Sequence, residues 1–473
     1  MKLRGAPLVV AFMLSAICTA SAQPARGQNS NETAAAARLE ALRGDSARLA
    51  AFLRAMPKGG DLHNHVSGAI SPVSWAGWAA ADGLCFVVST AALSRPPCDG
   101  RDRIPATRLL ADSRLMESAV EAWSMHNFHA GSESGADHFF ATFGKTAAVG
   151  NAHLGEMLAE VMSRAARDHV SYIELMVNAD DGSAARLGAQ IGAKDFSAMR
   201  AELERTGLEA ALRHVTSALN DAEQRQRELL RCGTKTADPG CGVTVRYIYQ
   251  IVRNRAPQVV FAQILAGFTL PSIDRRYVSF NLVAPEHSGV AARDFELHMR
   301  MIDFLRASHP NIPITLHAGE LSRAVASPAT MRSHIRQSIQ LGHASRIGHG
   351  VDVLQEDSAD SLLGEMARRH VLVEIALASN DVILGVRGPA HPLAAYLAHG
   401  VPVALATDDE GVSVSDMTLE YTRAVSDQHL GYVALKTMAR NSIAYSFADD
   451  TTKKRLQSEL ERDFDRFERS PPR

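Results

Sequence analysis

Asp61-Leu62-His63-Asn64-His65 closes a short β-type run, and four later fragments repeat this placement of reactive side chains beside an apolar run. The four fragments are His317-Ala318-Gly319-Glu320, Arg346-Ile347-Gly348-His349-Gly350, Ala378-Ser379-Asn380-Asp381 and Ala406-Thr407-Asp408-Asp409-Glu410. Together the five fragments supply imidazole and carboxylate groups without a thiolate, a ligand set that suits zinc or a similar divalent metal. The sequence therefore predicts a metal site assembled from the ends of several strands.

From residue 57 onward, short apolar runs alternate with longer segments of helical spacing. Eight of these runs are predicted strands: residues 60–65, 171–178, 244–252, 277–284, 312–317, 345–349, 371–377 and 401–407. Several are almost continuously apolar, as expected of strands buried on both faces, and the last five are far enough apart for one crossover helix each. Eight such units favour an α/β fold of the closed (β/α)8 TIM-barrel type over an open doubly wound sheet. No Gly-x-Gly-x-x-Gly follows a strand, which also disfavours a dinucleotide-binding sheet.

Two connections are much longer than the others and predict extra helices inserted after strands 1 and 2. Residues 66–170 should add helices and a loop above the barrel mouth, and residues 179–243 should add further helices. Ahead of the barrel, the Ala-rich helical spacing from Asn31 to Met56 predicts one helix, which Pro57 ends.

The first residues have the pattern of a secretory signal peptide. Basic residues precede an apolar run over residues 8–20, and Ala20-Ser21-Ala22 offers a small-x-small cleavage site before Gln23. The run is too short to read as a membrane span. We therefore expect an exported protein, periplasmic or secreted. The expected parts are a signal peptide over residues 1–22, an N-terminal leader and helix over residues 23–56, and the metal-dependent barrel domain over residues 57–473.

Removal of such a signal peptide would leave four cysteines: Cys85, Cys98, Cys232 and Cys241. An even number of cysteines in an exported chain suggests disulfides. The two close pairs, Cys85–Cys98 and Cys232–Cys241, are the favoured connectivities, and free thiols are the alternative. No Cys-x-x-Cys is present, so the cysteines are not predicted metal ligands.

The formal net charge is -2, with 22% charged and 46% hydrophobic residues. A nearly neutral chain of this composition gives no electrostatic footprint for nucleic acid or for anionic lipid. We therefore expect no nucleic-acid partner and, after cleavage of the signal peptide, no membrane partner. The oligomeric state stays open.

Four side chains are the predicted metal ligands. His63 and His65 are two residues apart, so they face the same side of one strand. His317 ends another apolar run and adds a third imidazole, and Asp408 adds a carboxylate. Such a set leaves a position for water, as in catalytic metal sites. Taken alone, a His-x-His pair also fits two hydrogen-bonded structural histidines.

Three further side chains could carry protons near that metal. Glu320, three residues past His317, could shuttle protons if burial raises its pKa, although it could instead serve a helix N-terminus. His349 could deprotonate or orient the attacking water, or be a core histidine bonded to backbone. Asp409 stands next to Asp408, and adjacent carboxylates repel unless one binds a cation and the other a proton or a donor.

The ordered set His-x-His, His-Ala-Gly-Glu, Gly-His-Gly, Ser-Asn and Thr-Asp-Asp resembles the adenosine deaminase family of the amidohydrolase superfamily, including its secreted members. The resemblance implies hydrolytic deamination at purine C6 with one Zn2+ per chain, held by His63, His65, His317 and Asp408. It also implies that Glu320 protonates purine N1, that His349 serves the attacking water, and that Asp409 bonds purine N7. The predicted fourth strand, residues 277–284, contains no lysine, which favours one metal over a bridged pair.

The substrate-binding residues that the resemblance implies are Asp409, Ala284, Ser67, Ser379 and Asn380. Two of them depart from the family pattern. Ser67 stands where relatives usually carry the Asp that helps to hold the ribose, and Ala284 stands where they usually carry a Gly whose backbone meets purine N3. A third departure is Ala376-Leu377-Ala378 in place of Cys-Pro before Ser-Asn. Since all three departures surround the substrate, deamination is better supported than adenosine itself.

The sequence therefore predicts an enzyme that deaminates adenosine and 2′-deoxyadenosine to release ammonia. The first alternative keeps the chemistry and changes the substrate to another 6-aminopurine or amino-heterocycle. The second alternative is a non-enzymatic secreted protein that binds nucleosides or acts like a growth factor. The complete set of ligands and proton-transfer groups argues against a binding role alone.

Overall fold

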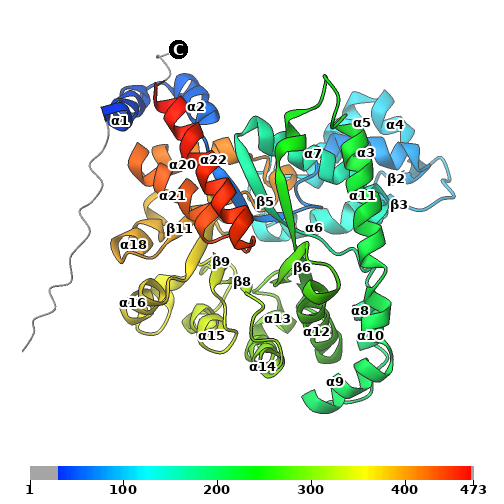
Figure 1. The fold of residues 1–473 in the computed structure, drawn as a ribbon. Coiled ribbons are helices and arrows are strands. Elements are labelled where there is room, and N and C mark those ends of the chain that lie inside the picture. The colour runs from blue at the N-terminus through cyan, green and yellow to red at the C-terminus, as the bar shows by residue number, and fades with distance from the viewer. Residues whose placement is uncertain (1–29, 470–473) are drawn as a thin grey trace, which may run out of the picture.

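The computed structural model describes residues 30–469 (Figure 1). Within this range eight parallel strands form two four-stranded sheets, with orders β1-β5-β6-β7 and β11-β10-β9-β8. Their bounds are β1 (Gly59–His65), β5 (Val170–Met176), β6 (Thr244–Val252), β7 (Tyr277–Val283), β8 (Thr315–Ala318), β9 (Arg346–His349), β10 (Leu372–Ile375) and β11 (Val403–Leu405). The predicted signal peptide, residues 1–22, lies outside the described residues.

The two sheets meet along two seams and close a ring. At one seam an isolated parallel bridge joins Asn64 to Asp408, with His65 N donating to Asp408 O and Asp408 N donating to His63 O, each at 2.9 Å. At the other seam β7 lies beside β8, and Asn281 Oδ1 accepts a hydrogen bond from His317 N at 2.7 Å. The predicted (β/α)8 TIM barrel is confirmed.

Helices surround this ring, and several of those in the second half of the chain lie outside the strands in Figure 1. The helices of this half are α12 (Pro257–Ile273), α13 (Gly289–Arg293), α14 (Phe295–Arg306), α15 (His334–Gln340), α16 (Ala359–Arg369), α17 (Leu377–Leu384), α18 (Leu393–Ala398), α19 (Glu410–Ser413), α20 (Met417–Ser426), α21 (Tyr432–Ala444) and α22 (Asp450–Arg469). Among residues 30–469, no helix has the length and apolar character needed to cross a bilayer.

Both predicted insertions are present. The first contains α3 (Pro72–Ala81), β2 (Cys85–Val87), β3 (Ala92–Ser94), β4 (Arg103–Pro105), α4 (Thr107–Ala111), α5 (Ser113–Trp123), α6 (Gly135–Thr146) and α7 (Leu154–Arg167). The second contains α8 (Ser183–Gly188), α9 (Phe196–Arg205), α10 (Leu208–Leu212) and α11 (Val215–Leu229). Each insertion carries one of the favoured disulfides, Cys85–Cys98 and Cys232–Cys241. The antiparallel sheet β3-β2-β4 was not predicted, because strands of three residues are too short to show alternation.

The predicted helix from Asn31 to Met56 is wrong as a single element. The structure has two helices, α1 (Ser30–Leu42) and α2 (Ser46–Ala55), separated at Gly44. Asp45 begins the second helix by accepting a hydrogen bond from Arg48 N at 3.0 Å, so a local capping residue outweighs the helical spacing. In Figure 1 these two helices lie beside the C-terminal helix α22.

The floor of the barrel holds a buried ion cluster in place of an apolar plug. Arg346 on β9 lies 2.6 Å from a carboxylate oxygen of Glu174 on β5 and 2.6 Å from one of Glu374 on β10. The ring of Phe447 covers the Arg346 guanidinium at 3.7 Å, and Tyr172 donates to Glu174 at 2.7 Å. Since all three charged side chains are essentially inaccessible to water, each depends on the others for compensation.

Arg346→Met should therefore lower the free energy of unfolding by about 3–5 kcal/mol, because it leaves two buried carboxylates without their cation. The measurement is denaturant unfolding of the two proteins. The control is Arg213→Met, which removes an exposed helical pair with Glu209 and should cost no more than about 0.5 kcal/mol. Equal stability of Arg346→Met and the native protein would show that the cluster does not support the barrel.

Candidate metal centre and active site

The four predicted metal ligands converge at the carboxyl end of the barrel. His63 and His65 end β1, His317 lies on β8, Asp408 follows β11, and all four are buried. The ligand atoms lie within 4.8 Å of one another. His317 Nε2 is 3.0 Å from His63 Nε2 and 3.3 Å from His65 Nε2. Asp408 Oδ1 is 3.5 Å and 3.4 Å from the Nε2 atoms of His63 and His65.

The outer nitrogen of each imidazole is held by an oxygen acceptor from another strand. The acceptors are Glu374 Oε2 for His63 Nδ1 at 2.8 Å, Gln250 Oε1 for His65 Nδ1 at 2.8 Å, and Asn281 Oδ1 for His317 Nδ1 at 2.9 Å. An acceptor at Nδ1 places the proton there in the neutral ring and leaves the lone pair on Nε2. Three lone pairs and a carboxylate oxygen therefore face one another in a buried site, an arrangement that needs a cation.

The spacing of these atoms also fits a metal of the zinc type. Ligands on a tetrahedron with bonds of ~2.0–2.1 Å are separated by about 3.3 Å. The four measured ligand separations run from 3.0 to 3.5 Å. Nitrogen and oxygen donors without sulfur, three of them oriented by outer acceptors, are the set expected for a catalytic divalent metal.

The electrostatics of the four side chains also favour a cation at this point. Burial alone lowers the pKa of His63, but the Asp408 and Glu374 carboxylates outweigh it and raise that pKa to about 10. Burial lowers the pKa of His317 well below its ordinary value, and the charge of His63 adds to this shift. The two carboxylates therefore favour positive charge at His63, which a bound cation would supply.

Glu320 and His349 lie beside the cluster. Glu320 Oε1 is 3.8 Å from His349 Nε2, and these two groups and Asp408 have ligand atoms within 4.8 Å of one another. The Glu286 carboxylate fixes the backbone here by accepting from Gly319 N at 3.1 Å and Glu320 N at 3.0 Å. Burial raises the pKa of Glu320 to about 8, and the Asp408 charge adds to the shift, so the carboxyl can hold a proton at neutral pH.

Asp409 is buried and its Oδ1 has no hydrogen-bond partner among the described residues. Burial, together with the adjacent Asp408 charge, raises its pKa well above the ordinary value. A protonated Asp409 is a hydrogen-bond donor, which resolves the repulsion expected between the adjacent carboxylates. Gly68 packs directly against it, because a Cβ at that position would lie 1.5 Å from Asp409 Oδ1.

The other predicted substrate-binding residues divide into two groups. Ser379 and Asn380, on α17, form hydrogen bonds with predicted site residues. Ser379 Oγ donates to Asp408 Oδ2 at 2.6 Å, and Asn380 Nδ2 donates to His349 Nδ1 at 3.0 Å. Ser67 and Ala284 are half-buried and follow β1 and β7. Ala284 has φ 83°, a left-handed conformation that explains why glycine is usual there. Their substrate contacts stay predictions.

A separate apolar cluster packs beside the segments that carry these residues. Its buried members include Phe139 on α6, Val351 after β9, Ile383 on α17 and Val412 after Asp409. Helix α6 therefore brings aromatic side chains from the first insertion to the carboxyl end of the barrel. The placement agrees with the prediction that the first insertion stands above the barrel mouth.

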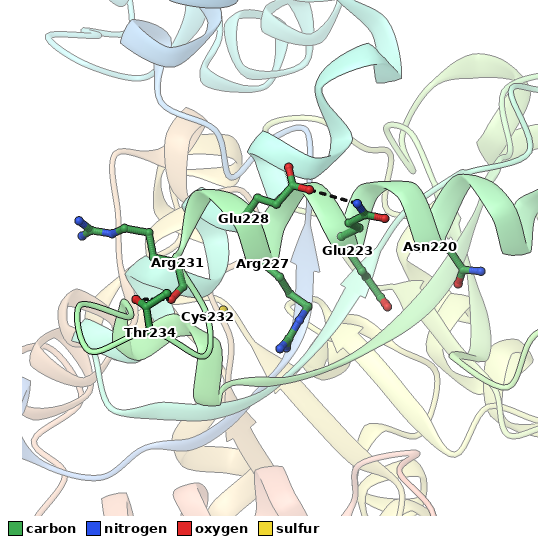
Figure 2. Close-up of a pocket in the computed structure, with 8 residues that line it drawn as sticks. Asn220, Glu223, Arg227, Glu228, Arg231, Cys232 and Thr234 are labelled. Carbon is green, nitrogen blue, oxygen red and sulfur yellow. Dashed lines mark hydrogen bonds between the residues drawn. The ribbon is translucent and has the colours of Figure 1, made fainter.

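A hollow elsewhere on the surface has different chemistry. It lies along α11, as Figure 2 shows. Its volume is about 680 Å³. The lining residues are Asn220, Glu223, Gln224, Arg227, Glu228, Arg231, Cys232 and Thr234. Its Glu228 already accepts from Gln224 at 3.1 Å, and it contains none of the predicted site residues, so it offers no competing active site.

Comparison with known proteins agrees with this geometry. The family model described as adenosine deaminase matches residues 111–463. The chain belongs to the adenosine deaminase family. An adenosine deaminase from Clostridium acetobutylicum is 31% identical over 208 residues, 42% of this chain and 58% of that protein. A putative adenosine/adenine deaminase from Streptomyces virginiae is 31% identical over 231 residues, 48% of this chain and 62% of that protein. The matched regions thus span about three fifths of these relatives' length.

Solved structures resemble the chain over most of its length. An adenine deaminase from Arthrobacter aurescens has a TM-score of 0.58 at 18% identity, covering 86% of this chain and 99% of that one. Arabidopsis ADAL complexed with GMP has a TM-score of 0.54 at 19% identity, covering 87% and 98%. An amidohydrolase from Burkholderia ambifaria with bound Zn has a TM-score of 0.53 at 16% identity, covering 89% and 94%. At these identities the likeness establishes the shared fold.

Three supporting residues of this adenosine deaminase family member were not predicted. Glu374, Gln250 and Asn281 orient the histidines from β10, β6 and β7. Each is a polar residue inside a run that is otherwise largely apolar, such as Leu372-Val373-Glu374-Ile375. A lone polar residue in a doubly buried strand was the available signal, because it must find a partner inside the barrel.

Gln250→Leu should weaken zinc binding by about 10–100-fold, because His65 loses the acceptor that holds its proton on Nδ1. The affinity can be measured by competition with a chromophoric chelator. Gln250→Glu is the matched control, since it keeps an acceptor and should bind zinc at least as tightly as the native protein. Unchanged affinity in Gln250→Leu would remove Gln250 from the metal site.

Proposed function

We propose that this protein catalyses the zinc-dependent hydrolytic deamination of adenosine and 2′-deoxyadenosine, with release of ammonia. The observation that carries the proposal is a set of buried proton-transfer groups beside the ligand cluster. His349 Nε2 and Asp409 Oδ1 are buried without a hydrogen-bond partner among the described residues, and Glu320 lies within 3.8 Å of His349. Unsatisfied buried groups of this kind are rare unless a ligand or a reaction uses them.

Each group has a role in this proposal. When bound, a zinc ion would lower the pKa of a water ligand to about 7 and so supply a nucleophile at neutral pH. Glu320, protonated by virtue of its burial, donates its proton to ring N1 and makes C6 more electrophilic. Asp409, also protonated, donates a hydrogen bond to N7 and orients the purine. His349 directs its free Nε2 toward the oxygen that attacks C6.

A second candidate keeps this chemistry and changes the substrate to another 6-aminopurine or amino-heterocycle. It is favoured by Ser67, which provides no carboxylate for a ribose, and by Ala284, whose methyl group narrows the pocket where glycine is usual. The first experiment is therefore a deamination assay of the protein with one equivalent of zinc. Ammonia release is measured for adenosine, 2′-deoxyadenosine, adenine and AMP. Adenosine turnover that a chelator abolishes is expected. Turnover of adenine or AMP alone would favour the second candidate, and silence on all four with zinc bound would favour a binding protein.

We also propose that the protein is exported after cleavage following Ala22, which leaves an N-terminal segment over residues 23–56, with α1 and α2, and the barrel domain over residues 57–473. The support is the basic, apolar and small-residue pattern of residues 1–22. N-terminal sequencing of the protein recovered outside the cytoplasm should begin at Gln23. An intact Met1 on that protein would contradict the proposal.

Glu320→Gln should retain stoichiometric zinc and lose about 10²–10⁴-fold in kcat, because an amide cannot relay protons. Zinc content is measured by elemental analysis alongside the steady-state rates. The contrasting variant is Asp408→Ala, which should lose zinc itself because it removes the anionic ligand. Near-native turnover by Glu320→Gln would exclude its role as the acid.

Gly68→Ala should lower kcat/KM by about 10²-fold, because the new methyl group displaces Asp409 from the purine. Zinc content should not change, since Asp409 is not among the ligands. Gly77→Ala on α3 is the control, because a Cβ there meets nothing within 4 Å and should leave activity unaltered. Equal activity of the two variants would show that Asp409 has no fixed place in substrate binding.

A further inference from the structure

His391 has no part in the chemistry above, yet it begins a buried line of hydrogen bonds that ends on His349. Leu393 N donates to His391 Nδ1 at 3.2 Å, and His391 Nε2 lies 3.0 Å from Asn380 Oδ1. Asn380 Nδ2 in turn lies 3.0 Å from His349 Nδ1. The three side chains are at most 2% exposed and come from the loop before α18, from α17 and from β9.

The direction of every bond in this line follows from its first donor. A backbone N–H can only donate, so His391 Nδ1 must be the acceptor and its proton sits on Nε2. That proton goes to Asn380 Oδ1, which turns the Asn380 amide nitrogen toward His349. His349 Nδ1 must then accept, so the proton of the neutral ring sits on Nε2. The reversed Asn380 amide would set its N–H against the N–H of His391.

We propose that His391, acting through Asn380, is a positioning residue that holds His349 in the Nε2–H tautomer. His349 then presents a donor, not a lone pair, to the atoms that react. Of the two roles that the sequence allowed for His349, this arrangement favours orienting the attacking water and disfavours deprotonating it. The inference deepens the proposed function, on which its catalytic meaning rests, but the tautomer itself can be observed without any turnover.

The hydrogen bonds from Leu393 to His349 do not depend on pH in the ordinary range, because His391 stays neutral there. Burial lowers the pKa of His391 to about 4, so this ring stays neutral at ordinary pH. A neutral His391 has one donor nitrogen and one acceptor nitrogen. The hydrogen bond from Leu393 N therefore fixes the direction of the bonds to Asn380 and His349.

The test is the tautomer of His349, read from long-range ¹H–¹⁵N correlation spectra of protein with ¹⁵N-labelled histidine, before and after zinc loading. The His349 signals are assigned by their loss in His349→Phe. In the native protein the proton should be on Nε2. In Asn380→Asp it should move to Nδ1, because a carboxylate accepts from both His391 and His349. A native proton on Nδ1, or no move in Asn380→Asp, would overturn the proposal.

Kinetics provide the second readout. His391→Leu should lower kcat by about 10–100-fold with KM and zinc content nearly unchanged, as for loss of an orienting hydrogen bond. His391→Gln should restore the rate and the tautomer, because a glutamine can accept from Leu393 N and donate to Asn380. The exposed His399→Leu, on the next turn of chain after α18, is the control and should behave as the native protein. Equal rates in His391→Leu and His391→Gln would contradict the proposal.

The proposed deamination and the positioning role of His391 can each be contradicted without the other. If His391→Leu does not fold, Asn380→Asp and His391→Gln still decide the tautomer. If no aminopurine is turned over while the tautomer pattern holds, the proposed function fails and the positioning role stands. If turnover is found but the native tautomer is Nδ1–H, the proposed function stands and the positioning role fails.

Discussion

Three imidazole lone pairs and a carboxylate oxygen face one another in a buried space, and the closure of the barrel runs through the same residues. His63 and His65 belong to one half-sheet, and His317 and Asp408 to the other. The backbone bonds between His63, His65 and Asp408 close one seam, and the bond from His317 to Asn281 closes the second. A cation held by these four side chains would therefore join the two four-stranded sheets, and its binding free energy would contribute to the stability of the fold.

The buried charges of Arg346, Glu174 and Glu374 at the floor of the barrel also support the candidate metal site. Arg346 holds the Glu374 carboxylate as an anion, and Glu374 in turn holds the proton of His63 on Nδ1. The buried Arg346 thus acts on the metal site through two steps, from the floor of the barrel to its mouth. This explains why the strands carry charged residues where an apolar side chain would pack with less cost.

The sequence was sufficient to predict the barrel and which side chains meet at its mouth, because these residues sit at the ends of apolar runs that parallel strands bring to one edge. It was not sufficient for their supports. Asn281 had a signal as a lone polar residue in a buried strand, but the sequence does not say that it supports His317. His391 is recognisable only once α17, α18 and β9 are in place. Leu377 was predicted to end a strand and instead begins α17, because Glu420 caps that helix by accepting from Leu377 N at 2.6 Å. A cap that lies 43 residues away in sequence leaves no local signal.

The most direct measurement of this account is X-ray absorption at the zinc edge of the reconstituted protein. We predict one zinc per chain, with nitrogen and oxygen ligands at about 2.0–2.2 Å and the outer-shell scattering of three imidazoles. The same spectrum should be lost in a protein that lacks Asp408. Zinc–sulfur scattering at about 2.3 Å, two ions per chain, or the absence of histidine scattering would contradict the account.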